Sequence, residues 1–210
     1  MKKLTLIALA MSALGAASAN AQSLKFTGTQ LNPVDSGTIN VNGNSSTVEM
    51  GALVFSTGTK SIVTYCADAT SPLNNSNNPY SVSGVNMNDG SGLALAAKIL
   101  ATNFDVATNK DQQAALQVAI WDALYDNGSS FNYSSGKFKV TNGLSSSVLS
   151  LASTYYTNGK NSNPTTAVEL FTSQGAGGQS QLHVVPEPAS LAVLGLGVFG
   201  LVRRRKSSSR

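Results

Sequence analysis

The 210-residue chain contains one cysteine, one histidine and one tryptophan, and only 11% of its residues are charged. A single cysteine excludes an internal disulfide, and one cysteine with one histidine offers too few ligands for a zinc site of thiolates and imidazoles. The sequence also lacks a glycine-rich phosphate loop before a helix and an Asp-rich calcium loop with regular spacing. We therefore expect no metal and no cofactor.

Basic residues are scarce in the middle of the chain. Residues 22–185 carry 7 basic and 9 acidic side chains, and the other 7 of the 14 Lys and Arg residues lie in the two end segments. A nucleic-acid-binding domain usually presents a basic patch to the phosphate backbone. We therefore expect no nucleic acid among the partners.

Groups suited to turnover catalysis are also few. His183 lies at the edge of the predicted domain, where a solvent-facing strand histidine is a simpler interpretation than a Ser-His-Asp triad. The acidic residues of the helical region are typical of helix ends and solvent faces. An exported hydrolase with a carboxylate pair is therefore the weakest hypothesis, and we do not expect an enzyme. The acidic residues concerned are Asp105, Asp111, Asp122 and Asp126.

The first 21 residues have the order of a secretory signal peptide. Two lysines precede an apolar stretch, and small residues stand at the end of the segment. This pattern predicts cleavage between Ala21 and Gln22 and export of the mature chain. The low charge and the abundance of Asn, Ser, Thr and Gly in residues 22–185 agree with an exported domain.

The last 25 residues combine a proline motif, an apolar stretch and a basic cluster. The apolar stretch of 14 residues, 189–202, would span about 21 Å as a helix, which is short against a hydrocarbon core of about 30 Å. Taken alone, this pattern predicts a short tail anchor whose basic end stays on the cytoplasmic side. The flanking motifs are Pro186-Glu187-Pro188 and Arg203-Arg204-Arg205.

The order of these three parts resembles the PEP-CTERM sorting signal of exported bacterial proteins. The resemblance implies processing near Pro186-Glu187-Pro188 by an exosortase-type membrane protease, after a transient stay in the inner membrane. It also implies a bacterium with an outer membrane and a final place at the cell surface or in the extracellular matrix. Residues 186–210 are therefore expected to be a sorting signal with a short transmembrane helix.

Residues 22–185 predict one α+β domain. Short apolar runs separated by turn residues predict strands, and apolar spacing of three and four predicts helices, the second of them capped by Asn109. Strands on both sides of a helical region indicate a β-sandwich or barrel with an inserted helical section. The segment 68–91 is expected to be an irregular loop. The predicted strands are 24–26, 38–41, 48–55, 61–65, 165–171 and 181–185, and the predicted helices are 93–104, 110–125 and 144–156.

Two residues of the body call for a chemical explanation. Cys66 ends a predicted strand and, in an exported protein, is a free buried thiol, an intermolecular bridge or a partner in other chemistry. Gln117 shares a helical stripe with Trp121 and should point inward. A buried amide costs free energy unless its hydrogen bonds are satisfied, so Gln117 is either a core amide bonded to loop backbone or a reactive group.

The pairing of a Tyr-Cys strand end with a helical Gln-x-Ala-Ile-Trp resembles the thioester domain of bacterial surface proteins. That domain has a Thr-Gln-x-Ala motif, and Leu116 stands here where the motif has Thr. The resemblance implies that the Cys66 thiol and the Gln117 side chain condense, with loss of ammonia, into an internal thioester. The residues that carry the resemblance are Tyr65, Cys66, Gln117, Ala119, Ile120 and Trp121.

Such a thioester would react with an amine or hydroxyl on a surface target and form an amide or ester. The bond needs an apolar shield against water, for which Trp121, Tyr65 and Ile120 are the candidates by position. Asp68 and Asp122 are the nearby carboxylates, without a ranking as general base. The alternative is a passive matrix protein, as in an exopolysaccharide biofilm, in which Cys66 is buried or forms an intermolecular bridge.

Overall fold

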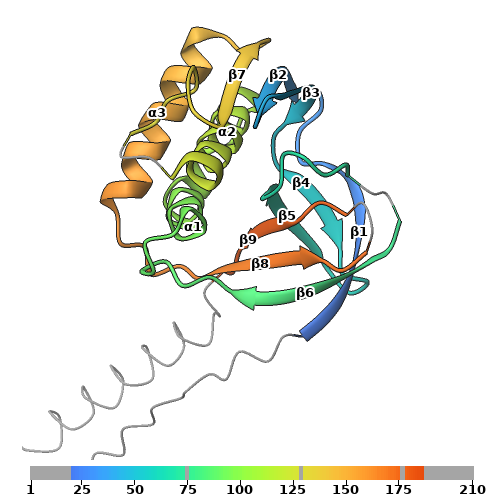
Figure 1. The fold of residues 1–210 in the computed structure, drawn as a ribbon. Coiled ribbons are helices and arrows are strands. Elements are labelled where there is room, and N and C mark those ends of the chain that lie inside the picture. Colours follow the sequence, from blue (N-terminus) through green and yellow to red (C-terminus); the bar gives the residue numbers. More distant parts are fainter. Residues whose placement is uncertain (1–19, 74–75, 128–129, 176–177, 187–210) are drawn as a thin grey trace, which may run out of the picture.

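The computed structural model describes residues 20–73, 76–127, 130–175 and 178–186 (Figure 1). The predicted signal peptide up to residue 19 and the tail from Glu187 onward, with its expected transmembrane helix, lie outside the described residues. Within the described ranges, no helix combines the length and the hydropathy needed to cross a bilayer.

Six of the described strands close into an antiparallel barrel. Their order around the barrel is β1-β4-β5-β9-β8-β6. Apolar side chains of five of these strands fill the interior as a separate small core of Leu24, Phe55, Ile62, Tyr80 and Phe171. The strands are β1 (Asn20–Thr29), β4 (Leu53–Ser56), β5 (Ser61–Cys66), β6 (Asn78–Gly84), β8 (Val168–Ser173) and β9 (Gln181–Val184).

A three-stranded sheet, of order β3-β2-β7, stands beyond one end of the barrel. Strands β2 and β3 form a hairpin in which Asn42 and Gly43 both have positive φ, at 51° and 92°, which matches the right-handed twist of the strands. Gly37, Ile39 and Val41 alternate toward the core along β2, as expected for a half-buried strand. The strands are β2 (Asp35–Val41), β3 (Asn44–Met50) and β7 (Phe138–Asn142).

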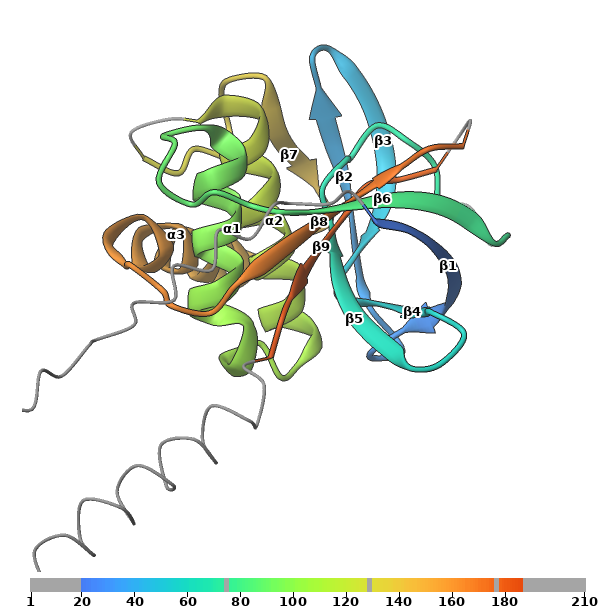
Figure 2. The ribbon, with the colours of Figure 1, turned by 90° about the horizontal axis from the view of Figure 1, so that it is seen from below.

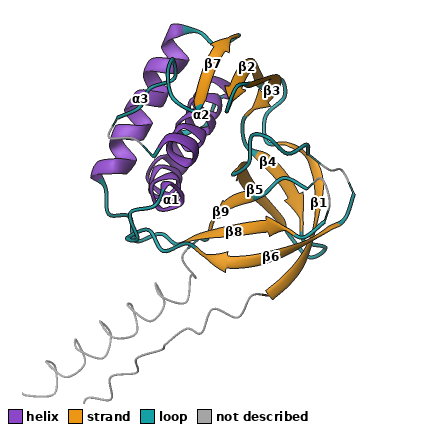
Figure 3. Cartoon of the chain, in the orientation of Figure 1, coloured by secondary structure: helices purple, strands orange, loops and turns teal. Residues whose placement is uncertain are grey.

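Three helices form a layer beside the barrel, and Figure 2 shows the two parts side by side. The central helix, α2, is buried along residues 113–123 and packs against both other helices and the small sheet. Gly159 lets α1 and α3 cross closely, because a Cβ there would clash with the backbone of Ile99. The helices are α1 (Gly92–Asn103), α2 (Lys110–Asp126) and α3 (Ser146–Asn161), coloured in Figure 3.

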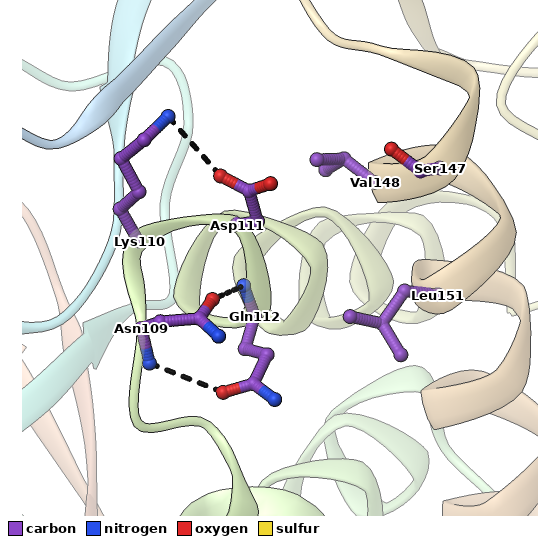
Figure 4. Close-up of a pocket in the computed structure, with 7 residues that line it drawn as sticks. All are labelled: Asn109, Lys110, Asp111, Gln112, Ser147, Val148 and Leu151. Atoms are coloured by element: carbon purple, nitrogen blue, oxygen red, sulfur yellow. Dashed lines mark hydrogen bonds and ion pairs between the residues drawn. The ribbon is translucent and has the colours of Figure 1, made fainter.

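Helix α2 begins with a capping box. The Asn109 side chain accepts a hydrogen bond from Gln112 N at 3.0 Å, and Gln112 Oε1 accepts one from Asn109 N at 3.1 Å. Figure 4 shows this pair opposite Val148 and Leu151 of α3. The two backbone N–H groups, which have no partner within the helix, are both satisfied. The start of the helix and the position of every later turn are therefore fixed.

The α+β class and the barrel with an inserted helical section are confirmed. Two strands were not predicted: β6 lies inside the segment expected to be an irregular loop, and β7 lies between the second and third helices. The run 48–55, predicted as one strand, is divided at Gly51, and its two halves belong to different sheets. Strand β1 begins at Asn20, so the predicted cleavage before Gln22 would remove only its first two residues.

Candidate functional site

Cys66 is the last residue of β5, where the barrel meets helix α2. The strand pairs with β9, and Cys66 lies opposite Gln181 in that register. The side chain is 4% exposed and forms no disulfide. The strand therefore ends with a buried thiol directed at the interface between the barrel and the helical layer.

Gln117 lies in the middle of α2, and its amide is paired with the backbone of Cys66. Cys66 N donates to Gln117 Oε1 at 2.9 Å, and Gln117 Nε2 donates to Cys66 O at 2.9 Å. Gln117 is 1% exposed, in agreement with its predicted inward direction. Residues 51 positions apart thus form a closed two-bond ring in which the amide carbon lies beside the residue that carries the thiol.

The thiol itself interacts with the next turn of chain. Cys66 Sγ donates to Asp68 O at 2.9 Å and accepts from Asp68 N at 3.3 Å. Burial raises the pKa of the Cys66 thiol, while the backbone N–H of Asp68 and the nearby Trp121 indole act in the opposite direction. The group is therefore a neutral thiol at physiological pH, held in place by the loop that follows it.

Trp121 lies one helical turn after Gln117 and covers the site. Its side chain is 2% exposed and packs on Phe138 of β7 with ring centroids 6.0 Å apart. The indole Nε1 makes no hydrogen bond of normal geometry to any described residue. An unpaired buried donor costs about 1–3 kcal/mol, so this N–H is available for an acceptor that forms nearby.

Cys66, Gln117 and Trp121 line one cavity of about 290 Å³. Its remaining wall comes from the second half of β1, the end of β3, the turn into β4 and its first residue, the loop after Cys66, and Gln179, two residues before β9. The sequence did not predict these contributions, since they depend on which strand ends meet in the barrel. They are Phe26, Thr29, Val48, Glu49, Gly51, Leu53, Ala69, Ser71, Pro72, Leu73 and Gln179.

The other predicted motif residues do not line this cavity. Tyr65 points to the opposite face of β5, where it packs on Phe104 with ring centroids 6.5 Å apart. Ala119, Ile120 and Leu116 are fully buried in the core of the helical layer. Of the three residues expected to shield the site from water, Trp121 alone lies at it, because side chains alternate along a strand and rotate by about 100° per residue along a helix.

The two nearby carboxylates have separate surroundings. Asp68 Oδ1 accepts hydrogen bonds from Thr70 N at 2.9 Å and Ser71 N at 3.2 Å. Burial alone would raise the pKa of Asp68, but the hydrogen bonds of Ser71 and Thr70 outweigh it and lower the pKa. Asp68 is thus an ionised residue that shapes the loop beside the thiol.

Asp122 lies on another face of α2 and does not meet the thiol. Its Oδ1 accepts from Asn132 N at 3.2 Å, and its Oδ2 has no partner among the described residues. Burial raises its pKa to about 7, with a smaller contribution from Asp126. The expectation of a solvent-face carboxylate is wrong here: Asp122 is 1% exposed, because the 131–138 segment covers it.

A second buried glutamine precedes Gln117 by one turn. Gln113 Oε1 accepts from Ala52 N at 3.3 Å, and its Nε2 donates to Gln30 Oε1 at 2.7 Å. Its spacing of four from Gln117 was the signal that could have revealed it. No cysteine lies beside it, since the chain has only one.

The expectation of a solvent-facing His183 is also wrong. The side chain is 9% exposed, its Nδ1 lies 2.8 Å from Val63 O, and its ring packs edge-on against Phe171. A carbonyl only accepts, so Nδ1 carries the proton in this contact. His183 stabilises the pairing of β5 and β9 away from the cavity.

Three solved structures are similar to the chain. The N-terminal thioester domain of a surface protein from Clostridium perfringens aligns with a TM-score of 0.46 and 12% identity, covering 79% of this chain and 100% of that one. The N-terminal thioester domain of the fibronectin-binding protein SfbI from Streptococcus pyogenes gives 0.45 and 14%, covering 75% and 98%. The N-terminal domain of the Streptococcus pyogenes pilus tip adhesin Cpa gives 0.49 and 14%, covering 83% and 97%.

Among curated protein sequences, none matches the chain. Residues 184–206 match the family described as the PEP-CTERM protein-sorting motif, as expected from the proline motif, apolar stretch and arginine cluster. The chain therefore carries a PEP-CTERM sorting signal, which marks it for export through a membrane-held intermediate and for processing by an exosortase.

Proposed function

We propose that the chain is an exported surface or extracellular-matrix protein whose Cys66 and Gln117 form an internal thioester for covalent attachment to a target. The observation that carries the proposal is the reciprocal pair of 2.9 Å hydrogen bonds between the Gln117 amide and the Cys66 backbone. This pair holds the amide beside the backbone of Cys66, which carries the only thiol of the chain, and both residues line one cavity. Such fixed proximity lowers the barrier of an otherwise slow condensation.

The first step is a balanced acyl exchange. Cys66 Sγ attacks Gln117 Cδ, the new carbon–sulfur bond replaces the carbon–nitrogen bond, and ammonia leaves with the thiol proton. As the tetrahedral intermediate forms, negative charge develops on Oε1, which already accepts the Cys66 N–H. One such donor contributes about 3 kcal/mol to the stability of an oxyanion.

The second step releases the thiol. An amine or hydroxyl of the target attacks Gln117 Cδ, the carbon–sulfur bond breaks, and the proton of the nucleophile passes to sulfur. The departing thiolate needs a donor in a buried site, and Trp121 Nε1 is the unpaired donor at hand. Each molecule reacts once, so the protein acts as a single-use reagent and not as a turnover enzyme.

A passive matrix protein is the second candidate, and Gln113 favours it. That residue shows that α2 also buries a glutamine whose amide bonds only to backbone and to another amide. If Gln117 had the same role, Cys66 would remain a buried free thiol. The two candidates differ in one measurable quantity, the mass of the folded chain.

The test is an accurate intact mass of fresh exported protein that has never met amine buffers or high pH. Thioester formation removes ammonia, so we expect a mass about 17 Da below that of the sequence, and methylamine should be taken up while one thiol appears. Cys66→Ala should abolish both signals, whereas Gln113→Ala should keep them. A wild-type mass equal to the sequence mass would favour the passive protein.

A further inference from the structure

The cavity and the chain ends lie at opposite ends of the barrel. The cavity is lined from Thr29 at the end of β1, Leu53 at the start of β4 and Cys66 at the end of β5. The chain enters the barrel at Asn20, the first residue of β1, and leaves it at Val184, the last residue of β9. In Figure 1 these two ends lie at the bottom of the barrel, and β3 and the start of β4 lie at the top.

The strand registers also place the cavity and the exit point of the chain at opposite ends of the barrel. Cys66 pairs with Gln181, the first residue of β9, so the strand runs from the cavity to the exit point at Val184. Three residue steps along a strand cover about 10 Å. At the exit end, β9 is held by the pairing of Val184 with Val168 and by the hydrogen bond from Val185 N to Ala167 O.

The sorting motif begins where the barrel ends. The PEP-CTERM match starts at residue 184, the last residue of β9, so the sorting motif follows the barrel directly in the sequence. The membrane-sorting segment is therefore joined to the exit end of the barrel and not to the cavity end.

We propose that the sorting intermediate holds the barrel with its Cys66 end away from the membrane, so that the site takes its covalent partner from the surrounding space before the tail is processed. This inference rests on the proposed thioester for its chemistry, and on the strand topology and the position of the sorting motif for its orientation. The partner is then a macromolecular nucleophile outside the bilayer, and the amines of membrane phospholipids are out of reach.

Orientation is tested first, by a measurement that needs no thioester. In a Cys66→Ala chain with the motif Pro186-Glu187-Pro188 replaced by alanines to retain it in the membrane, a single fluorescent label is placed at Ser83→Cys or at Ser46→Cys. Both serines are exposed; Ser83 is in β6 near the exit end, and Ser46 is in β3 beyond the cavity end. Lipids with a nitroxide headgroup should quench the label at position 83 several-fold more than the label at position 46. Equal or stronger quenching at position 46 would overturn the proposal.

Reactivity is tested second, on the retained chain with Cys66 intact. In spheroplasts, an aminated dextran should react with the chain at a rate within about twofold of the rate measured in detergent. A tenfold change in rate corresponds to about 1.4 kcal/mol in the activation free energy. A tenfold slower reaction in the membrane, or a phospholipid adduct on Gln117, contradicts the outward orientation. Failure of methylamine to react in detergent would contradict the proposed thioester and not the orientation. The quenching experiment would then test the orientation by itself.

Discussion

The two polar faces of helix α2 are buried in different ways. Toward the barrel, the helix presents two neutral amides, Gln113 and Gln117, and both are satisfied by hydrogen bonds to described groups. Toward the 131–138 segment it presents Asp122 and Asp126, and one oxygen of Asp122 has no described partner. Neutral amides can be buried at little cost when satisfied, whereas a buried carboxylate has to keep its proton or lose stability.

The two faces should therefore have different properties: the amide face carries the groups of the proposed reaction, and the carboxylate face responds to pH. The amide face holds the Gln117 amide beside Cys66, whose thiol is neutral because burial raises its pKa, so both groups keep their form over a wide pH range. On the carboxylate face, Asp122 titrates near neutrality, because burial raises its pKa to about 7. Substitutions on each face should therefore change different measurable properties.

The largest contrast is expected between the two glutamines. Gln117→Ala should abolish the 17 Da deficit completely and lower the free energy of unfolding by about 2–5 kcal/mol, because it removes a cross-link and leaves the Cys66 N–H and C=O unpaired. Gln113→Ala should lower it by about 1–3 kcal/mol through the unpaired Ala52 N–H and keep the deficit. Intact mass and urea denaturation measure the two effects. Loss of the deficit in Gln113→Ala as well would mean that the position of the helix, and not the Gln117 amide alone, controls the reaction.

The second largest effect is expected from Asp122→Asn, on stability against pH. The folded pKa of about 7 exceeds the ordinary aspartate pKa of 3.8, so the folded state keeps a proton that the unfolded state loses between about pH 4 and pH 7. The free energy of unfolding should therefore fall as pH rises through this window and stay low above it. The asparagine stays neutral and can still accept from Asn132 N, so the variant should be about 2–4 kcal/mol more stable than wild type at pH 8.

Urea denaturation at pH 5 and pH 8 checks this expectation. Asp111→Asn is the matched control, because its carboxylate is about half exposed at the start of the same helix. The control should keep the wild-type fall between the two pH values. A wild type that is equally stable at both values contradicts the assignment.

The sequence predicted the inward direction of Gln117 and drew attention to Cys66, but it did not predict the walls of the cavity that they share. Helical spacing placed Gln117 inward, and a lone cysteine at a strand end drew attention to Cys66, because both signals are local. The covering residues come from strand ends and loops that meet only in the closed barrel, such as Phe26, Leu73 and Gln179. No local pattern encodes which strand lies beside which.

The missed strands have the same cause. Strand β6 begins Asn-Pro and lies after a loop rich in Asn and Ser, so its composition indicates a turn, and it becomes a strand through pairing with β1 and β8 on both sides. Asp122 was misjudged because its cover, the 131–138 segment, is irregular apart from β7. Tertiary pairing overrode local preference in each case.

A smaller effect is expected from Trp121→Phe. The variant keeps an aromatic ring against Phe138 but loses the Nε1 donor, so the departing thiolate is less stabilised and release by methylamine should slow about tenfold, which is about 1.4 kcal/mol. The mass deficit should persist, and the pKa of the released thiol should rise. Ile120→Val is the control, since this neighbour is buried but does not line the cavity. Equal release rates and equal thiol pKa values in Trp121→Phe and wild type would exclude the indole from the reaction.

The smallest effect is expected at the start of α2. Asn109→Ala removes the side-chain acceptor of Gln112 N and half of the capping box, which should cost about 1 kcal/mol in the free energy of unfolding. Gln117 lies two turns further along and is held by its own bonds to Cys66, so the thioester should form as in wild type and the mass deficit should stay complete. Thermal unfolding measures the first quantity and intact mass the second. Asn109→Ser, which keeps a capping oxygen, should recover most of the stability. Loss of the deficit in Asn109→Ala would instead mean that the amide face depends on the cap for its register, and that a local change at one end of the helix reaches the reactive carbon.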